Sequence, residues 1–464
     1  MVDKSKKVKS LKNSNKKTKK IQINNKAIVT HIIDDELNRL FTFTNNIQQI
    51  LVKYQYITKK TQLQVLDKID NVPTYHYSNL DSIHKEINKL HKQRDDIIFI
   101  HNKISNDDIK IITRLVENYA RGVSAFVMQN YDLSGLLVPK VSNGFIKLWE
   151  IYNIFNIIPN KKKVKVFHLA EAPGQWINCT HYFILTKRPK VEEYDWKATS
   201  LNPKNKANIK KYGSNIFGHR DEYGLLKKYT NRWIWGADDT GDITSIDNLK
   251  WYRNYCKKWE KETGKIDLIL GDGGIQSNDI IENQKLEYSQ LFTVLGTASI
   301  GSNCIIKHFL PYLRRIPKTL KSGGYFSNLI YVYYLMFETV ILIKPMSSSP
   351  ISGEYYVVGK SFRGISKAHF EKIINTLDNF IPNQCIFPQN EIPDEFVKQV
   401  LEFNKSILNL NILSENMRIE YLQCFSKDNK IKKELDCNKY INSKYYNNIK
   451  NLKFKEWIKE FKFE

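Results

Sequence analysis

The sequence predicts an α/β fold: a mostly parallel sheet with an antiparallel edge hairpin, flanked by helical N- and C-terminal regions. Short apolar runs alternate with helical stretches between residues 140 and 362, which is typical of an open α/β sheet. Outside this region, apolar residues recur at the three- and four-residue spacing of helices. We therefore expect a disordered basic tail at 1–26, a helical region at 27–135, an α/β domain at 136–362 and a helical extension at 363–464.

The individual elements follow in chain order. Helices are expected at 35–51 and 82–93, and a further helix start is expected at 390–393. The expected strands are 164–169, 195–200, one preceding the loop at 235–244, then 266–270, 303–306, 339–343 and 355–358. The last two strands, joined by the Ser/Pro-rich segment 346–353, predict the hairpin. The apolar stretch 329–343 is shorter than the roughly 20 residues of a bilayer span, so we expect a helix running into a buried strand.

Composition narrows the class of partner. The 464 residues include 72 Lys and Arg against 48 Asp and Glu, a formal charge of +24. This charge predicts attraction to polyanions, nucleic acid before an anionic membrane, unless it reflects only a Lys-, Asn- and Ile-rich composition. The six cysteines form no CxxC pair, which excludes a disulfide scaffold and favours a reducing compartment.

Targeting and metal signals are not expected either. No Cys or His pairs have the spacing of zinc ligands, so no metal site is predicted. The Lys-rich N-terminus is not followed by an apolar segment of the kind found in secretory signals. We expect a cytoplasmic or nuclear protein with no membrane partner.

Four polar or glycine-containing segments follow predicted strands. They are Glu171-Ala-Pro-Gly174, Ser200-Leu-Asn-Pro203, the Gly/Asp loop at 235–244 and Asp272-Gly-Gly274. Open α/β sheets bind ligands at the carboxyl ends of their strands, and a helix start after a glycine turn suits a carboxylate or phosphate. The first turn is neither GxGxxG nor a P-loop, which lowers the expectation of a dinucleotide and excludes a P-loop site.

Together with Ile305-Ile-Lys307 and Glu354-Tyr-Tyr-Val-Val358, these segments resemble the FtsJ-type family of S-adenosylmethionine-dependent RNA 2′-O-methyltransferases. Within it, the chain is most similar to the Adrift-type branch, which includes eukaryotic mRNA cap methyltransferases. The motifs occur in family order over residues 140–362. The resemblance implies a Rossmann-like methyltransferase sheet with S-adenosyl-L-methionine as cofactor.

The resemblance also implies a cofactor site. Gly174 would lie against the methionine part, Tyr194 beside the adenosine, and Asp242 with Ile243 at the adenine, while Asp272 would also border the cofactor. One departure is the sequence Ser-Leu-Asn at 200–202, where many nucleotide-binding sheets place an acid for the ribose hydroxyls. The resemblance therefore assigns no acid to the ribose hydroxyls at this position.

Lys147, Asp272, Lys307 and Glu354 match the family's Lys-Asp-Lys-Glu tetrad position by position. A ribose hydroxyl must lose its proton to accept a methyl group, and a lysine with a lowered pKa can take it. Lys307 is the expected general base, with Asp272 and Glu354 shaping its charge and Lys147 holding the hydroxyl or a phosphate. Each residue alone also has a structural explanation as a solvated charge or a turn residue.

The expected substrate is RNA, at the first or second nucleotide of the mRNA cap, with capping-machinery proteins as partners and virion association if the source is viral. Two alternatives stay open: a non-catalytic RNA-binding or scaffold subunit of a capping complex, and a ribosomal RNA 2′-O-methyltransferase. Trp233 and Trp235 are expected in the core. The serines of 346–353 are candidate RNA contacts unless that loop is only flexible, and the candidate phosphate-binding lysines are 161–163, Lys204, Lys206, Lys210 and Lys211.

Overall fold

The computed structural model describes residues 50–51, 59–70, 81–101, 106–213, 221–274, 279–310, 323–424 and 444–463. The predicted tail at 1–26 and most of the helix predicted at 35–51 lie outside these residues. Among the helices described, none is long and apolar enough to cross a membrane. Nor does this part of the chain hold a cluster of three or more His, Cys, Asp or Glu placed to bind a metal.

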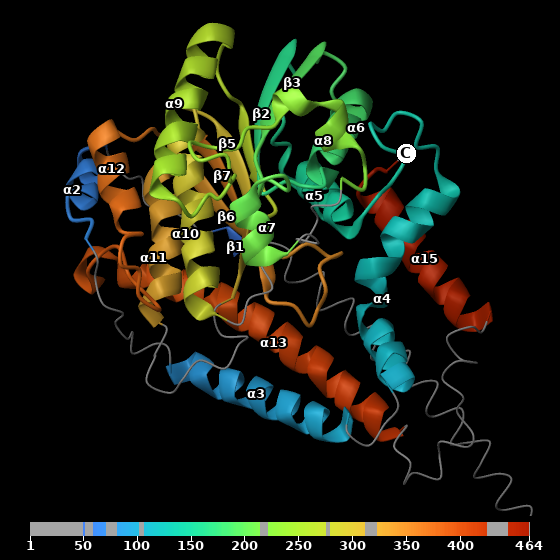
Figure 1. The fold of residues 1–464 in the computed structure, drawn as a ribbon. Coiled ribbons are helices and arrows are strands. Elements are labelled where there is room, and N and C mark those ends of the chain that lie inside the picture. Colours follow the sequence, from blue (N-terminus) through green and yellow to red (C-terminus); the bar gives the residue numbers. More distant parts are fainter. Residues whose placement is uncertain are drawn as a thin grey trace, which may run out of the picture. The chain divides into compact units, whose positions relative to one another are not determined.

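A seven-stranded sheet forms the centre of the described region, in the order β1-β6-β7-β5-β4-β2-β3 (Figure 1). The strands are β1 (Ile50–Leu51), β2 (Lys163–Leu169), β3 (Glu193–Ala198), β4 (Leu268–Gly271), β5 (Asn303–Phe309), β6 (Phe337–Ile343) and β7 (Glu354–Phe362). β3, β2, β4 and β5 are parallel, whereas β7, β6 and β1 add antiparallel pairs. The α/β class and the antiparallel hairpin are confirmed. β1 adds two strand residues within the region predicted to be helical.

Alternating side chains bury both faces of the sheet. In β2, Val164 and Val166 pack into one core, and Phe167 and Leu169 pack into the other. This alternation is the two-residue period of a strand, and it explains why the apolar runs of the sequence become strands. The sheet is thus a middle layer between two hydrophobic layers.

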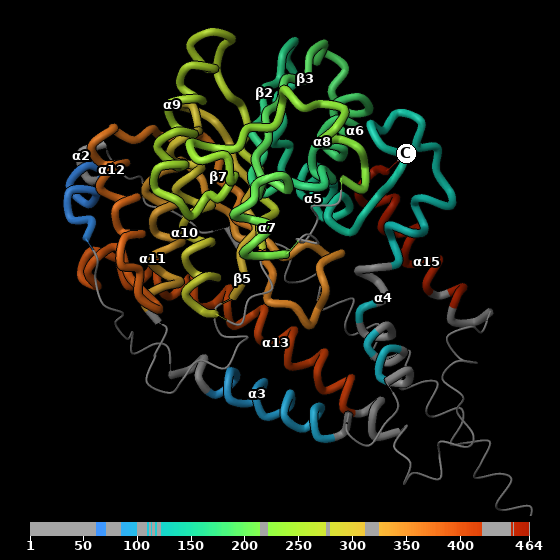
Figure 2. The backbone as a smooth tube through the Cα atoms, viewed as in Figure 1, coloured from blue at the N-terminus to red at the C-terminus, as the bar shows by residue number. Residues whose placement is uncertain are grey.

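One face is covered by α4 (Asn106–Asn130), α5 (Asn143–Phe155), α6 (Gln175–Lys187) and α15 (Lys444–Glu460). The other is covered by α2 (Lys59–Leu66), α3 (Asp81–His101), α9 (Ile246–Thr263), α10 (Ile280–Thr297), α11 (Gly323–Met336), α12 (Lys367–Asn375) and α13 (Asp394–Cys424). α3 and α13 run side by side, although they flank the sheet in sequence (Figures 1 and 2). Helical segments before and after the sheet thus pack against each other.

Three sequence expectations have clear outcomes in this region. The stretch 329–343 is the end of α11 followed directly by β6, and α13 begins at Asp394, both as predicted. The strand predicted before the Gly/Asp loop is wrong. Only an isolated parallel bridge joins Ala198 to Trp233, because the chain there comes from the short helices α8 (Leu225–Lys228) and η2 (Thr230–Arg232) and leaves the sheet after one pairing.

Candidate functional site

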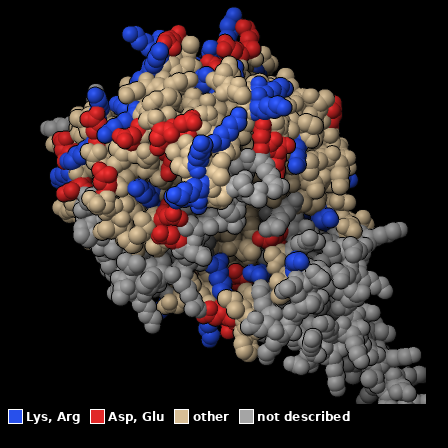
Figure 3. Space-filling view, viewed as in Figure 1, with Lys and Arg blue, Asp and Glu red and all other residues tan. Residues whose placement is uncertain are grey.

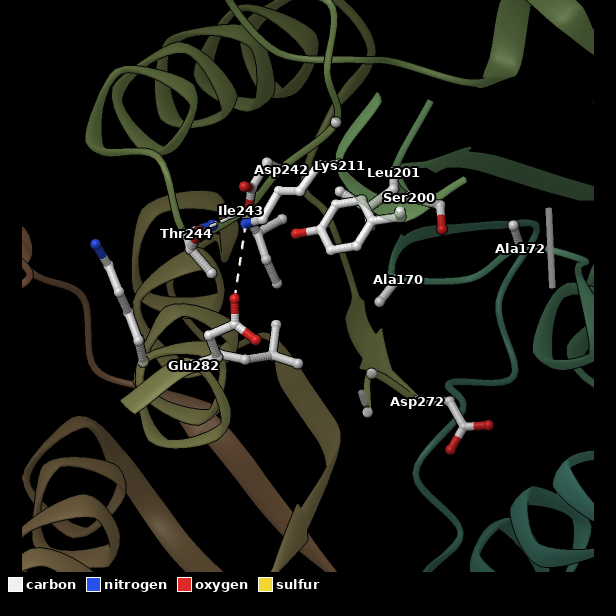
Figure 4. A pocket seen from close by; sticks show the side chains of 16 residues that line it. Ala170, Ala172, Ser200, Leu201, Lys211, Asp242, Ile243, Thr244, Asp272 and Glu282 are labelled. Atoms are coloured by element: carbon white, nitrogen blue, oxygen red, sulfur yellow. Dashed lines mark hydrogen bonds and ion pairs between the residues drawn. The ribbon is translucent and has the colours of Figure 1, made fainter. Parts of the chain in front are cut away.

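A cavity of about 400 Å³ opens at the carboxyl ends of the parallel strands (Figure 4). Its walls come from the segments after β2, β3 and β4, from the Gly/Asp loop, from α7 (Lys206–Tyr212) and from α10. The lining residues are Ala170, Ala172, Ser200, Leu201, Lys211, Tyr212, Gly241, Asp242, Ile243, Thr244, Asp272, Gly273, Gly274, Glu282, Lys285 and Leu286. Apolar side chains and carboxylates together suit a ligand with a flat apolar part and a positive charge.

The side chain of Asn248 on α9 forms hydrogen bonds that fix the conformation of the Gly/Asp loop. Its Oδ1 accepts hydrogen bonds from the backbone N–H groups of Ala237 and Asp238, at 2.7 and 3.3 Å. Its Nδ2 donates to Asp238 Oδ1 and to the carbonyl of Asp242, both at 2.9 Å. The buried amide therefore fixes the backbone that presents Asp242 and Ile243 to the cavity. Sequence reasoning missed Asn248 because nothing in its helical pattern distinguishes it from a solvated asparagine.

Gly241 lies where two loops meet at the cavity wall. A Cβ atom there would lie 1.7 Å from the carbonyl oxygen of Ser200, and its φ of +71° is left-handed. Nearby, Asn202 donates from Nδ2 to the carbonyl of Asp239, at 2.9 Å, and from its backbone N–H to Thr240. The asparagine that stands where many sheets carry an acid is thus used to join the loops.

The first glycine turn is organised by a buried carboxylate. Glu171 Oε1 accepts the backbone N–H groups of Trp176 and Ile177, at 2.8 and 3.0 Å, in the first turn of α6. Burial raises the pKa of Glu171, opposed by nearby His168. Gly174, at the N-cap of α6, is not among the cavity residues, and an added Cβ there would meet Leu225 at 2.4 Å. Glu171 thus holds the turn in place, and Ala172 of this turn lines the cavity.

Tyr194 is not among the residues that line the cavity. It stands near the start of β3, beside Val164 of β2, whereas the cavity borders the residues that follow the end of that strand. Its hydroxyl forms a 2.8 Å hydrogen bond with Nε2 of His168 inside the protein. The hydroxyl thus reaches toward the carboxyl end of β2, and the placement of Tyr194 beside the adenosine stays a prediction.

The four tetrad residues form two ion pairs beside the cavity. Lys307 Nζ lies 3.0 Å from Asp272 Oδ1, and Lys147 Nζ lies 2.6 Å from Glu354 Oε1. Side-chain exposure is only 12% for Lys307, 15% for Lys147 and 10% for Glu354. Four charged groups that are far apart in sequence therefore meet in a largely enclosed region.

Helices hold both pairs in place. Ser142 caps α5 by accepting the N–H of Phe145, and α5 carries Lys147 one turn later. Gln290 on α10 accepts the N–H of Gly273 at 3.1 Å and donates to the carbonyl of Lys307 at 3.2 Å. One glutamine side chain therefore ties together the ends of β4 and β5, which present Asp272 and Lys307.

The charge states of Lys147 and Glu354 are set by the groups around them. Burial acts to lower the pKa of Lys147, but Glu354 and Asp272 outweigh it and raise this pKa. Burial acts to raise the pKa of Glu354, but Lys147, Lys307 and Lys344 overcome it and lower this pKa to about 2. Lys147 is therefore a fixed cation and Glu354 a fixed anion near neutral pH. The two ion pairs also interact with each other: Asp272 helps to raise the pKa of Lys147, and Lys307 helps to lower the pKa of Glu354.

A third lysine, Lys344, completes the buried charge cluster. Its Nζ donates to the carbonyls of Ser352 and Glu354, at 2.8 and 3.0 Å, and to Ser348 Oγ at 3.1 Å. Burial lowers the pKa of Lys344 to about 7, opposed by Glu354. Lys344 ends an apolar strand in the sequence, and no local signal indicates its approach to Glu354.

The candidate RNA contacts separate into distinct places. Lys161, Lys162 and Lys163 lie at the amino end of β2, opposite the cavity, and pair with Asp267, Glu192 and Glu193 respectively. Lys204, Lys206 and Lys210 are exposed at or near α7, while Lys211 lies 3.9 Å from Glu282 across the cavity lining (Figure 4). In Figure 3, basic and acidic side chains are interspersed on the face shown. The lysines of 161–163 are therefore not part of a surface around the cavity.

In the hairpin loop Ser347 and Ser348 are buried, whereas Ser349 and Ser352 are partly exposed. The hydroxyls of Ser347 and Ser348 are therefore not exposed to RNA. Trp233 is 4% exposed and stacks on the half-buried Trp235 with ring centroids 6.0 Å apart. Both tryptophans thus contribute to packing under the Gly/Asp loop, as expected.

Residues 140–362 match a family described as FtsJ-like methyltransferase. An uncharacterized protein of Acanthamoeba polyphaga mimivirus is 31% identical over 61% of this chain and 34% of its own length. The cap-specific mRNA (nucleoside-2'-O-)-methyltransferase 2 of Pongo abelii is 25% identical over 68% of this chain and 40% of its own length. A protein of African swine fever virus named "Probable methyltransferase" is 28% identical over 48% of this chain and 49% of its own length. The chain thus spans between a third and a half of the curated relatives it matches.

Proposed function

Since residues 140–362 form an FtsJ-like methyltransferase domain, we propose that the protein transfers a methyl group from S-adenosylmethionine to a ribose 2′-hydroxyl of RNA. The proposed acceptor is the first or second nucleotide of an mRNA cap. The observation that carries the proposal is the pair of ion pairs, Lys307–Asp272 and Lys147–Glu354, beside a cavity at the carboxyl end of the sheet. The similarity to a cap-specific 2′-O-methyltransferase supports the choice of acceptor.

The cavity fits the cofactor on its own chemistry. Leu201, Ile243 and Leu286 provide apolar walls for an adenine ring, and Asp242 lies next to Ile243. Asp272 lies at the end nearer the tetrad and provides a carboxylate for a positively charged sulfur. When bound, S-adenosylmethionine would supply an electrophilic methyl group. In this proposal these residues hold and orient it, and Gly174, whose φ of +111° suits glycine, lies in the neighbouring turn.

The tetrad residues divide the work of activating the hydroxyl. Lys307 would take the proton from the 2′-hydroxyl during transfer of the methyl group to that oxygen. Lys147 is kept protonated by Glu354 and so holds the hydroxyl or a neighbouring phosphate by charge. Lys344 cannot replace Lys307 as base, because its side chain is buried and its Nζ already has three acceptors.

The test is methyl transfer from radiolabelled S-adenosylmethionine to matched capped and uncapped transcripts, followed by nuclease mapping of the labelled nucleotide. Label at the first or second nucleotide of the capped RNA is the expected result. Label only in uncapped structured RNA would favour a ribosomal-type substrate. RNA binding without any transfer would favour a scaffold role and contradict the proposal.

A further inference from the structure

The loop between β6 and β7, residues 345–353, is held by helices from both flanks of the sheet. Each contact joins a different loop residue to a side chain outside the hairpin. The contacts are Ser347 N–H to Glu150 on α5 (3.0 Å), Ser349 Oγ to Glu117 on α4 (3.0 Å), Asn411 on α13 to the carbonyl of Pro350 (2.6 Å) and Arg94 on α3 to the carbonyl of Ile351 (3.3 Å). Four helices thus meet on one short loop.

The inner side of the same loop contacts the tetrad. Ser348 Oγ donates to Glu354 Oε1 at 3.0 Å, the oxygen that also lies 2.6 Å from Lys147 Nζ. The N–H of Glu354 donates to Ser352 Oγ at 3.1 Å. The position of the Glu354 carboxylate is therefore determined by the conformation of the loop.

Asn411 connects the outer and inner sides. Its Nδ2 donates to the carbonyl of Ser352 at 3.2 Å, and Lys344 Nζ donates to that same carbonyl at 2.8 Å. Asn411 is fully buried, so water cannot replace its amide as a donor without opening the packing of α13 against the loop. A continuous set of hydrogen bonds therefore runs from α13 through Ser352 to Lys344 and Glu354.

We propose that Asn411 is a positioning residue for methyl transfer, acting through loop 345–353 to hold Glu354 against Lys147. This inference rests on the proposed function for its catalytic consequence, whereas the attachment of the loop to α13 does not. It gives α13 a role in the reaction although α13 lies outside the matched family region. The chemistry of transfer is unchanged, because Asn411 touches neither the cavity nor Lys307.

The test compares Asn411→Leu with the matched control Asn404→Leu. Asn404 lies on the same helix, is equally buried, and its amide makes no hydrogen bond within the described part of the chain. Asn411→Leu should speed amide exchange in the peptide covering 345–354 by about tenfold, because the hydrogen bonds from Asn411 to the carbonyls of Pro350 and Ser352 are both lost. It should also lower kcat by up to about a hundredfold while the KM and the Kd for S-adenosylmethionine stay unchanged. Asn404→Leu should change neither.

The outcomes distinguish the attachment of the loop to α13 from the role of that attachment in catalysis. Unchanged amide exchange in Asn411→Leu would overturn the attachment of the loop. Faster exchange with an unchanged kcat would overturn the positioning role. A parallel loss of cofactor affinity would also overturn it, since that indicates general damage to the domain. If the wild-type protein transferred no methyl group to RNA, the proposed function would fail, while the exchange comparison would still decide whether α13 holds the loop.

Discussion

Lys147 Nζ lies 2.6 Å from Glu354 Oε1 and joins the helix before the parallel strands to the first residue of β7. Both side chains are largely buried. Removing one charge would therefore leave the other buried without its partner, which destabilises the fold. We expect Lys147→Met to lower the free energy of unfolding by about 3–5 kcal/mol. Urea denaturation measures this change. In the double variant Lys147→Met/Glu354→Gln the loss should be smaller than the sum of the single losses, and additive losses would contradict a direct pairing.

Lys307 is the proposed base, so its replacement should act on the chemical step. We expect Lys307→Met to lower kcat by about 10²- to 10⁴-fold, the usual contribution of general-base catalysis. The Kd for S-adenosylmethionine, measured by calorimetry, should change little because Lys307 does not line the cavity. Lys360→Met is a suitable control, since Lys360 is also on the sheet but donates to the carbonyl of Phe155. Wild-type turnover by Lys307→Met would rule out the base assignment.

Replacing Gly241 tests whether the close contact of the two loops at the cavity wall is needed for cofactor binding. In Gly241→Ala the new methyl group would clash with the Ser200 carbonyl and push the two loops apart. We expect the Kd for S-adenosylmethionine to rise by at least about tenfold, equivalent to roughly 1.4 kcal/mol. Gly224→Ala is the matched control: its φ of +68° is similar, but nothing lies within 4 Å of its added Cβ. Equal losses in both variants would show that backbone strain, rather than the clash at the cavity, is responsible.

Glu150 should make stability depend on pH. Burial raises its pKa to about 7 from an ordinary value of 4.5, opposed by hydrogen bonds from Trp457 and Ser347. Between pH 4.5 and about pH 7 the folded protein binds more protons at Glu150 than the unfolded chain does. The contribution of Glu150 to the free energy of unfolding therefore falls as the pH rises through this range. The limiting slope for one group is about 1.4 kcal/mol per pH unit. Denaturant unfolding of Glu150→Gln should show this dependence removed, and an unchanged pH profile would contradict the raised pKa.

Periodicity and strand ends were enough to predict β2 to β7, the hairpin and the helix that leads into β6, but not β1, and the strand they placed before the Gly/Asp loop is wrong. The features predicted correctly depend on local sequence and on the burial of alternating side chains. Lys147, Asp272, Lys307 and Glu354 could be selected because their motifs follow predicted elements in order. Their pairing, Lys147 with Glu354 and Lys307 with Asp272, could not be predicted, since it depends on which strand ends are neighbours in space.

Buried polar residues were the main omission. Asn248, Gln290 and Asn411 each lie in a helix whose apolar spacing is ordinary. Each forms hydrogen bonds to backbone groups outside its own helix. Tyr194 illustrates the same limit: its backbone lies near the start of β3, and its hydroxyl bonds to His168 near the end of β2, a contact that no local pattern predicts. Residue type and spacing indicate which chemistry is available, but only the packing of helices on the sheet determines what each side chain reaches.

The burial of Phe463 bears on how the protein is prepared for experiment. Its ring lies 4.7 Å from that of Trp149 and also contacts Phe145 and Tyr182, on the two helices that carry or neighbour the tetrad. An expression fragment cut to residues 140–362 would leave these aromatic rings facing water. We expect such a fragment to aggregate during purification. Enzymology on this protein should therefore use chains that retain the segment 444–463.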